Sequence, residues 1–142
     1  NAGKVLPQFI NNVEDLMPSV CDWAEVEVPS GRQGVSFREV AEEGDTAKAH
    51  RPYVVTETFF GETAGTLGWM VRTPYYKYVL YDTGKNREQL YDMRTDRGEM
   101  RNLAVEEKYS TIVREHRALL DEWMRCHPSA ATHFKEKYIP KD

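Results

Sequence analysis

The chain has 142 residues, 40% hydrophobic and 30% charged, which is enough for one domain that needs neither a disulfide nor a metal to fold. Its net charge of −4 argues against nucleic acid as a partner, and no apolar run reaches the roughly 20 residues of a membrane-spanning helix. Acidic residues dominate residues 13–50, and basic residues are in slight excess over residues 69–101. A solvated surface explains this uneven charge.

The N-terminal third is expected to hold one short helix followed by loops. Asn11 can cap a helix with an acidic first turn, and apolar residues then recur on one face until about Ala24. Proline and glycine interrupt residues 25–37, which we expect to form a loop, and residues 38–50 are interpreted as an exposed connection. The first two residues, Asn-Ala, resemble the remnant of an expression tag, so we expect residues 1–2 to lie outside the fold.

Strands are predicted between residues 52 and 91, where β-branched and aromatic residues are frequent. Four strands are expected, at residues 52–60, 69–72, 75–81 and 88–91. Short connections favour antiparallel pairing. An apolar stripe at three-and-four spacing predicts a long helix from about Glu106 to Cys126. Packing of that amphipathic C-terminal helix on one face of a small four-stranded antiparallel sheet gives an α+β fold.

Residues that could carry chemistry each have a simpler structural interpretation. Cys21 lies among apolar neighbours, and Cys126 is adjacent to His127, although adjacent residues on a helix do not face each other. His116 lies on the apolar stripe, which indicates a buried, hydrogen-bonded histidine. We therefore expect no catalytic residue and no metal site in this chain.

Three carboxylates surround one turn, Asp92, Asp96 and Glu99, and could suggest calcium. Their spacing is not that of an EF-hand loop, and turn formation explains them more simply. We expect Asp96 to close the turn, Gly98 to adopt an unusual backbone angle and Asn102 to cap the next segment.

Substrate contacts are expected in two connections of the sheet. Residues 59–68 form a glycine-rich connection with aromatic residues at its root, and residues 72–74 form a corner between two strands. The predicted contact residues are Phe59, Phe60, Glu62, Thr66, Arg72 and Thr73. The tyrosines of the third strand could instead provide a stacking platform for sugars or bases.

Three segments resemble the C-terminal subdomain of the sulfatase family, in the alkaline-phosphatase-like superfamily. VEDLMPSVCDWA resembles the family's D-L-x-P-T helix, and VPSGRQGVSF resembles P-x-G-x-x-G-x-S-L. MVRTPYYKYVLY and EQLYDMRTDRGEMRNLA resemble V-R-T-x-x-x-K-Y and E-L-Y-D-L-x-x-D-P-x-E-x-x-N-L-A. Ser19, Glu25 and Arg97 depart from these motifs, where threonine, glycine and proline are usual. The similarity extends over residues 13–123 and is greatest to the branch with heparan N-sulfatase, iduronate sulfatase and choline-sulfatase-like enzymes.

The resemblance implies that the parent enzyme hydrolyses sulfate esters or sulfamates, with sulfated sugars as the expected substrates. Such enzymes use calcium and a formylglycine made in a C-x-P-S-R motif, which this sequence lacks. The resemblance therefore implies that catalysis belongs to an N-terminal α/β domain. Residues 3–37 would be the tail of that domain. Residues 38–142 would be the subdomain that packs on it and helps to shape the substrate pocket.

Other functions stay open from the sequence. The parent could be a phosphodiesterase or phosphonate hydrolase of the same superfamily, or the chain could be a stand-alone carbohydrate- or protein-binding module. The expected partners are the catalytic domain and a sulfated small molecule or glycan, with neither nucleic acid nor a membrane. An isolated fragment could form a homo-oligomer through apolar residues near Trp23. The resemblance implies a periplasmic, extracellular or lysosome-like parent.

Overall fold

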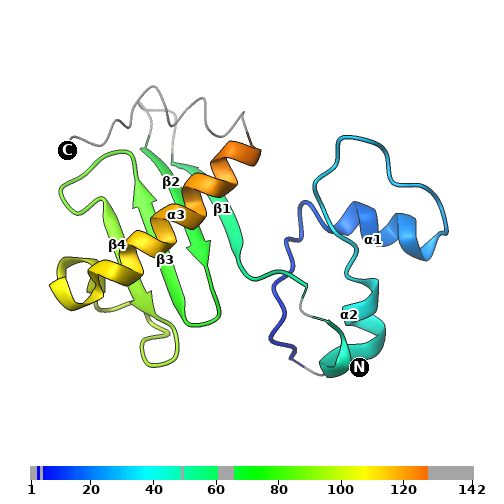
Figure 1. Ribbon diagram of the computed structural model, residues 1–142, viewed down its shortest axis with the longest axis horizontal. Coiled ribbons are helices and arrows are strands. Elements are labelled where there is room, and N and C mark those ends of the chain that lie inside the picture. The colour runs from blue at the N-terminus through cyan, green and yellow to red at the C-terminus, as the bar shows by residue number, and fades with distance from the viewer. Residues whose placement is uncertain (1–2, 4, 49, 61–65, 128–142) are drawn as a thin grey trace. The chain divides into compact units, whose positions relative to one another are not determined.

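The computed structural model describes residues 3, 5–48, 50–60 and 66–127, and the chain divides into two compact units, residues 1–54 and 55–142 (Figure 1). This boundary falls later in the chain than the change of domain expected after residue 37. The assignment of residues 3–37 to the tail of a preceding domain stays a prediction.

The first unit contains the helices α1 (Leu16–Trp23) and α2 (Arg38–Glu43) and the short 3-10 helix η1 (Gly44–Thr46). The short first helix is confirmed, although Asn11 does not cap it. The Asn11 side chain instead accepts hydrogen bonds from the backbone amides of residues 13 and 14, in a turn before the helix. The interpretation of residues 38–50 as an exposed connection is wrong, because α2 forms there and buries Val40, which is 3% exposed.

The second unit contains a four-stranded sheet in the order β1-β2-β3-β4. The strands are β1 (Val54–Phe60), β2 (Thr66–Arg72), β3 (Tyr76–Tyr81) and β4 (Glu88–Asp92). The pairs β2–β3 and β3–β4 are antiparallel, with Trp69 opposite Leu80 and Tyr78 opposite Leu90. The strand β2 begins earlier than expected because Leu67 is also anchored, its backbone amide donating to Oδ1 of the Asp82 side chain at 2.8 Å.

The helix α3 (Ser110–Cys126) lies across one face of this sheet, which confirms the predicted α+β fold (Figure 1). Two 3-10 helices precede it, η2 (Leu103–Val105) and η3 (Glu107–Tyr109). The α-helix therefore begins at Ser110, about one turn later than the predicted start at Glu106. Burial of large apolar side chains between the two layers stabilises the unit, at about 1.5–3 kcal/mol for each fully buried side chain. This core includes Trp69, Val71, Tyr78, Leu80, Leu90, Val113, Leu120 and Met124.

The turn after β4 is held by hydrogen bonds to its carboxylates and amide. The Asp96 carboxylate accepts the backbone amides of Met100 and Arg101, each at 3.0 Å, and the Asn102 side chain caps η2. Both predictions are confirmed. The unusual backbone angle, however, is not at Gly98 but at Glu99, whose φ is 57°.

Within the described residues, no helix combines the length and the apolar composition that crossing a membrane requires.

Candidate functional site

Three of the six predicted contact residues have described side chains, namely Phe59, Arg72 and Thr73. Phe59, at the end of β1, is 61% exposed and therefore open to a ligand or to another part of the protein. Phe60 and Thr66 lie in β1 and β2, and Glu62 lies outside the described residues.

The Thr73 side chain ties the β2–β3 corner to α3. Its Oγ1 lies 3.0 Å from Nε2 of His116, whose Nδ1 lies 2.8 Å from the carbonyl oxygen of Ile112. A carbonyl oxygen can only accept, so Nδ1 carries the proton and Nε2 accepts the Thr73 hydroxyl. Burial lowers the pKa of His116, which favours this neutral ring. The expectation of a buried, hydrogen-bonded histidine is confirmed.

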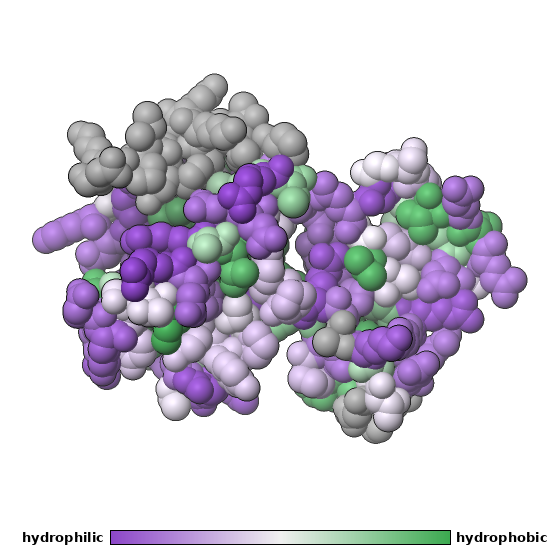
Figure 2. Space-filling view, viewed as in Figure 1, coloured by the Kyte–Doolittle hydropathy of each residue, from purple (hydrophilic) through white to green (hydrophobic). Residues whose placement is uncertain are grey.

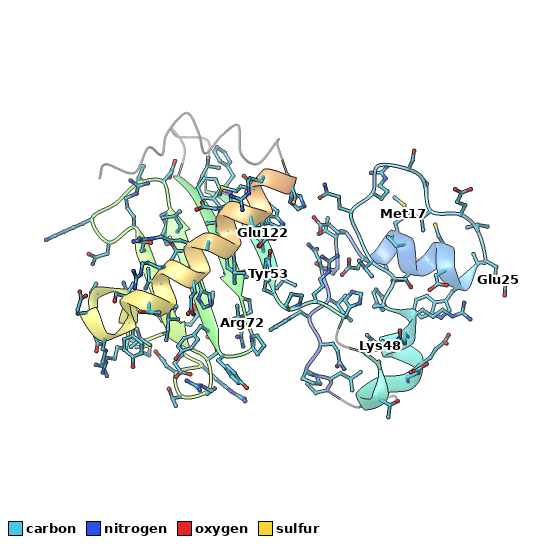
Figure 3. The ribbon with its side chains drawn as sticks, in the orientation of Figure 1. Met17, Glu25, Lys48, Tyr53, Arg72 and Glu122 are labelled. Carbon is cyan, nitrogen blue, oxygen red and sulfur yellow. The ribbon has the colours of Figure 1, made fainter. Side chains whose placement is uncertain are left out.

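Arg72, labelled in Figure 3, also stabilises the corner between β2 and β3. Its guanidinium donates to the carbonyl oxygen of Thr73 and, at 3.4 Å, to that of Tyr76. Burial lowers the pKa of Arg72, and the Glu99 charge partly offsets this effect. The geometry thus gives Arg72 and Thr73 a structural role at the corner, and their contact with a substrate stays a prediction.

Sequence reasoning missed the buried carboxylate of Asp15, which organises the first unit and is fully buried. Its oxygens accept hydrogen bonds from the backbone amides of Asn11 at 2.8 Å and Val35 at 2.9 Å, and from Nε of Arg51 at 3.0 Å. Nε2 of His50 lies 3.1 Å away. Burial alone raises the pKa of Asp15, but these hydrogen bonds outweigh it and lower the pKa to about 2. Asp15 is therefore an ionised structural hub.

Ser19 continues this hub and occupies the position where the family motif has threonine. Its hydroxyl donates to the Asp15 carbonyl at 2.6 Å and accepts the Phe37 amide at 2.9 Å. The motif D-L-x-P-S contains both hub residues, so it was the available signal. Their partners lie up to 36 residues away in the chain, which no local pattern indicates.

The sheet face opposite α3 carries a hollow of about 220 Å³. Lys77 belongs to this face, because it alternates with Tyr78, whose ring contacts His116 of α3. The Lys77 ammonium pairs with the Glu99 carboxylate at 2.7 Å, so its charge is already matched. The hollow is lined by Thr56, Thr58, Gly68, Trp69, Met70, Lys77, Val79 and Tyr81.

The cysteine, histidine and aspartate residues considered from the sequence have structural contacts among the described residues. No group of three His, Cys, Asp or Glu side chains among the described residues could hold a metal ion. Cys21 and Cys126 are not joined to each other in a disulfide. The ring of His127 stacks on Trp123 with 4.1 Å between centroids, and Asp92 pairs with Arg94 at 2.6 Å. The printed contacts of His127 and Asp92 are with close neighbours in the chain, which is a structural use of both side chains.

Comparisons with known proteins place the chain in an enzyme family. The family described as "N-sulphoglucosamine sulphohydrolase, C-terminal" matches residues 1–125. A Delta 4,5-hexuronate-2-O-sulfatase of Bacteroides thetaiotaomicron is 47% identical over 111 residues, which are 78% of this chain and 23% of that protein.

Two solved structures agree with this match. A 2-O GAG sulfatase superposes with a TM-score of 0.73 at 40% identity, over 90% of this chain and 27% of that one. A second structure, in complex with its substrate D-glucosamine-2-N,6-O-disulfate, gives a TM-score of 0.66 at 28% identity, over 76% and 22% of the two chains. The chain spans about a quarter of the length of these proteins. The family match and the shared fold together show that the chain belongs to the sulfatase family, as its C-terminal domain.

Proposed function

We propose that the whole protein is a sulfatase that removes sulfate groups from a sulfated sugar, and that this chain is its C-terminal part. The observation that carries the proposal is the 47% identity with a hexuronate-2-O-sulfatase over 78% of the chain. The whole protein would release inorganic sulfate from a uronic acid bearing a 2-O-sulfate. Within it, the chain packs on the catalytic domain and forms part of the substrate pocket.

Calcium and formylglycine would supply electrophilic and nucleophilic chemistry in such an enzyme. The residues of this chain do not fit them. The C-x-P-S-R motif is absent, since Cys21 is followed by Asp22 and Cys126 by His127. No metal-holding group occurs among the described residues. Both groups would therefore be held by the part of the protein that precedes this chain.

The exposed apolar surface of α1 supports packing on a catalytic domain. Leu16 and Val20 are each 54% exposed, and Trp23 is 43% exposed. Their spacing places all three on one face of α1. Hydrophobic residues are visible on the surface of this unit in Figure 2. Contiguous apolar surface of this kind marks an interaction site. We infer that the catalytic domain covers it, and that the free fragment would self-associate through it.

The pocket contribution is assigned to Phe59, at the root of the connection between β1 and β2. Its ring is largely exposed, whereas Arg72 and Thr73 are engaged at the corner. An exposed aromatic ring can rest against one face of a sugar. Replacement of Phe59 by alanine in the whole protein is expected to raise KM for a sulfated disaccharide about tenfold while leaving kcat within twofold, because only binding is lost.

Tyr75 provides the matched control, since it is an exposed aromatic residue, 57% exposed, at the opposite end of the sheet. Tyr75→Ala is expected to leave both constants unchanged. Equal effects of the two substitutions, or a fall in kcat with no change in KM for Phe59→Ala, would contradict contact between Phe59 and the bound sugar.

The proposed activity is tested by incubating the whole protein with a 2-O-sulfated unsaturated uronate disaccharide and measuring inorganic sulfate by ion chromatography. Phosphonate monoesters and phosphodiesters serve as competing substrates at equal concentration. Sulfate release at a kcat/KM at least a hundredfold above phosphonate cleavage is the expected result. The reverse preference would establish the phosphonate hydrolase alternative, and saccharide binding without any hydrolysis would establish the binding module.

A further inference from the structure

An open hollow of about 300 Å³ lies at the turn between β3 and β4, outside every site described above. Its volume is at the lower end of the range that small-molecule sites occupy, roughly 300–1,000 Å³. It combines basic, amide and aliphatic side chains. The lining residues are Leu80, Lys85, Asn86, Arg87, Glu88, Ala104 and Val105.

The basic wall of the hollow is formed by Lys85 and Arg87. Nε of Arg87 donates to the carbonyl oxygen of Tyr81 at 2.9 Å, which fixes the plane of the guanidinium. Lys85 is exposed and follows Gly84, whose φ of 102° lets the chain turn back. A guanidinium and an exposed ammonium that line the same hollow are a suitable arrangement for a sulfate or carboxylate group.

The acidic residue in the hollow is already matched. Both carboxylate oxygens of Glu88 accept hydrogen bonds from Arg117, and one also accepts the Tyr78 hydroxyl at 2.6 Å. Burial alone would raise the pKa of Glu88, but these partners outweigh it and lower the pKa. The Glu88 charge is therefore offset by Arg117, and the lining of the hollow carries two basic side chains, Lys85 and Arg87, against this one carboxylate.

The apolar floor is fixed to the turn by one side chain. Nδ2 of Asn102 donates to the Glu88 carbonyl at 3.0 Å, and its Oδ1 accepts the amides of Leu90 at 3.1 Å and Ala104 at 2.9 Å. Ala104 and Val105 are thereby held beside buried Leu80. Val105 is 68% exposed, so it offers an open aliphatic surface on which one face of a sugar ring could rest.

We propose that this hollow binds a sulfate or carboxylate group of an acidic oligosaccharide, away from the bond that is cleaved. Lys85 and Arg87 hold the anionic group, the Asn86 amide bonds a ring hydroxyl, and Val105 supports the apolar face of the ring. The preference for an anion rests on the charges described here. The choice of a saccharide as its carrier rests on the proposed function.

The test measures binding of the whole protein to an immobilised heparin octasaccharide by surface plasmon resonance. Lys85→Glu reverses an exposed charge in the hollow without removing a described contact. Arg97→Glu is the matched control, because Arg97 is also exposed and lies beyond the opposite end of β4. Lys85→Glu is expected to raise Kd about tenfold. Arg97→Glu should change Kd less than twofold, and Asn86→Ala should raise it two- to fivefold.

Three results would overturn the proposal. Equal Kd values for Lys85→Glu and the unchanged protein would remove the hollow from binding. Equal losses for Lys85→Glu and Arg97→Glu would indicate nonspecific charge attraction. Displacement by inorganic sulfate as effective as by free octasaccharide would indicate a small-anion site.

Sulfate release from the disaccharide separates this proposal from the proposed function. It should be unaffected by Lys85→Glu, since the proposal has the hollow bind a group away from the bond that is cleaved. If the protein releases sulfate normally and Lys85→Glu leaves the octasaccharide Kd unchanged, the proposal for the hollow is refuted and the proposed activity stands. Hollow-dependent binding without sulfate release refutes the proposed activity alone.

Discussion

Replacement of Asp15 by asparagine should selectively loosen the first unit. The fall of the Asp15 pKa from 3.8 to about 2 corresponds to about 2 kcal/mol in favour of the ionised folded state, since one pKa unit is about 1.4 kcal/mol. Asparagine also removes the closer ion pair of Arg51, whose side chain is 21% exposed, and leaves it the Glu14 carboxylate at 3.9 Å. Removing one member of a buried ion pair costs about 3–5 kcal/mol. We therefore expect a loss of about 3 kcal/mol.

Hydrogen–deuterium exchange of the whole protein, read by mass spectrometry, gives this loss peptide by peptide. The described partners of the Asp15 carboxylate all lie within residues 11–51, so the opening free energy should fall in peptides of that segment. Peptides from β3 and β4 should exchange as before. Asp22→Asn is the control, because Asp22 is an exposed carboxylate on the same helix and pairs with Arg38 at the surface.

The pH dependence of the same exchange follows from the lowered pKa. Between about pH 4 and pH 2 the unfolded Asp15 binds a proton that the folded Asp15 does not. The stabilisation from Asp15 is therefore complete above pH 4 and is lost as the pH falls toward 2. Asp15→Asn should flatten this slope. Equal losses of opening free energy for Asp15→Asn and Asp22→Asn, or a loss below about 1 kcal/mol for Asp15→Asn, would refute the role of Asp15 as a structural hub.

Two further predictions concern α3 and the first unit. The pKa of His116 is lowered from 6.5 by burial, so the unfolded state binds a proton first and stability should fall as the pH drops below about 6.5. His116→Asn should remove that slope in urea unfolding between pH 5 and pH 7.5, and an unchanged slope would contradict the assignment. A Cβ at Gly34 would lie 1.8 Å from the carbonyl oxygen of Glu14, whereas one at Gly98 would meet only the Met100 side chain at 3.5 Å. Thermal unfolding should therefore show Gly34→Ala to be strongly destabilising and Gly98→Ala to be tolerated, and equal melting temperatures would count against the close approach.

Local patterns in the sequence predicted most elements of the second unit. The apolar stripe of α3 has a period set by helix geometry, and Val113, Leu120 and Met124 on it are buried as that period requires. In β3, Tyr78 and Leu80 are both buried on one face, as the period of two in a strand requires. Turn chemistry at Asp96 and Asn102 was also predictable, because both side chains bond to backbone amides only a few residues away.

The errors occurred where neighbouring segments decided the outcome. Helix α2 is only six residues long and buries a single valine, Val40, so it has no helical stripe for a sequence to display. The left-handed angle fell on Glu99 instead of Gly98, and the Glu99 side chain pairs with Lys77 across 22 residues. Sequence patterns carry no information about such a distant partner.

The sequence by itself determined the family and the layered architecture, because motifs, periods and turns are written in neighbouring residues. Tertiary structure alone decided which side chains act together. It brought Arg51 and Val35 onto the Asp15 carboxylate, and it placed Val105 beside Lys85 at the β3–β4 turn. Hydrogen bonds and charge pairs act over a few ångströms of space, whatever the separation along the chain. The candidate sites of this protein therefore depend on contacts that only folding creates.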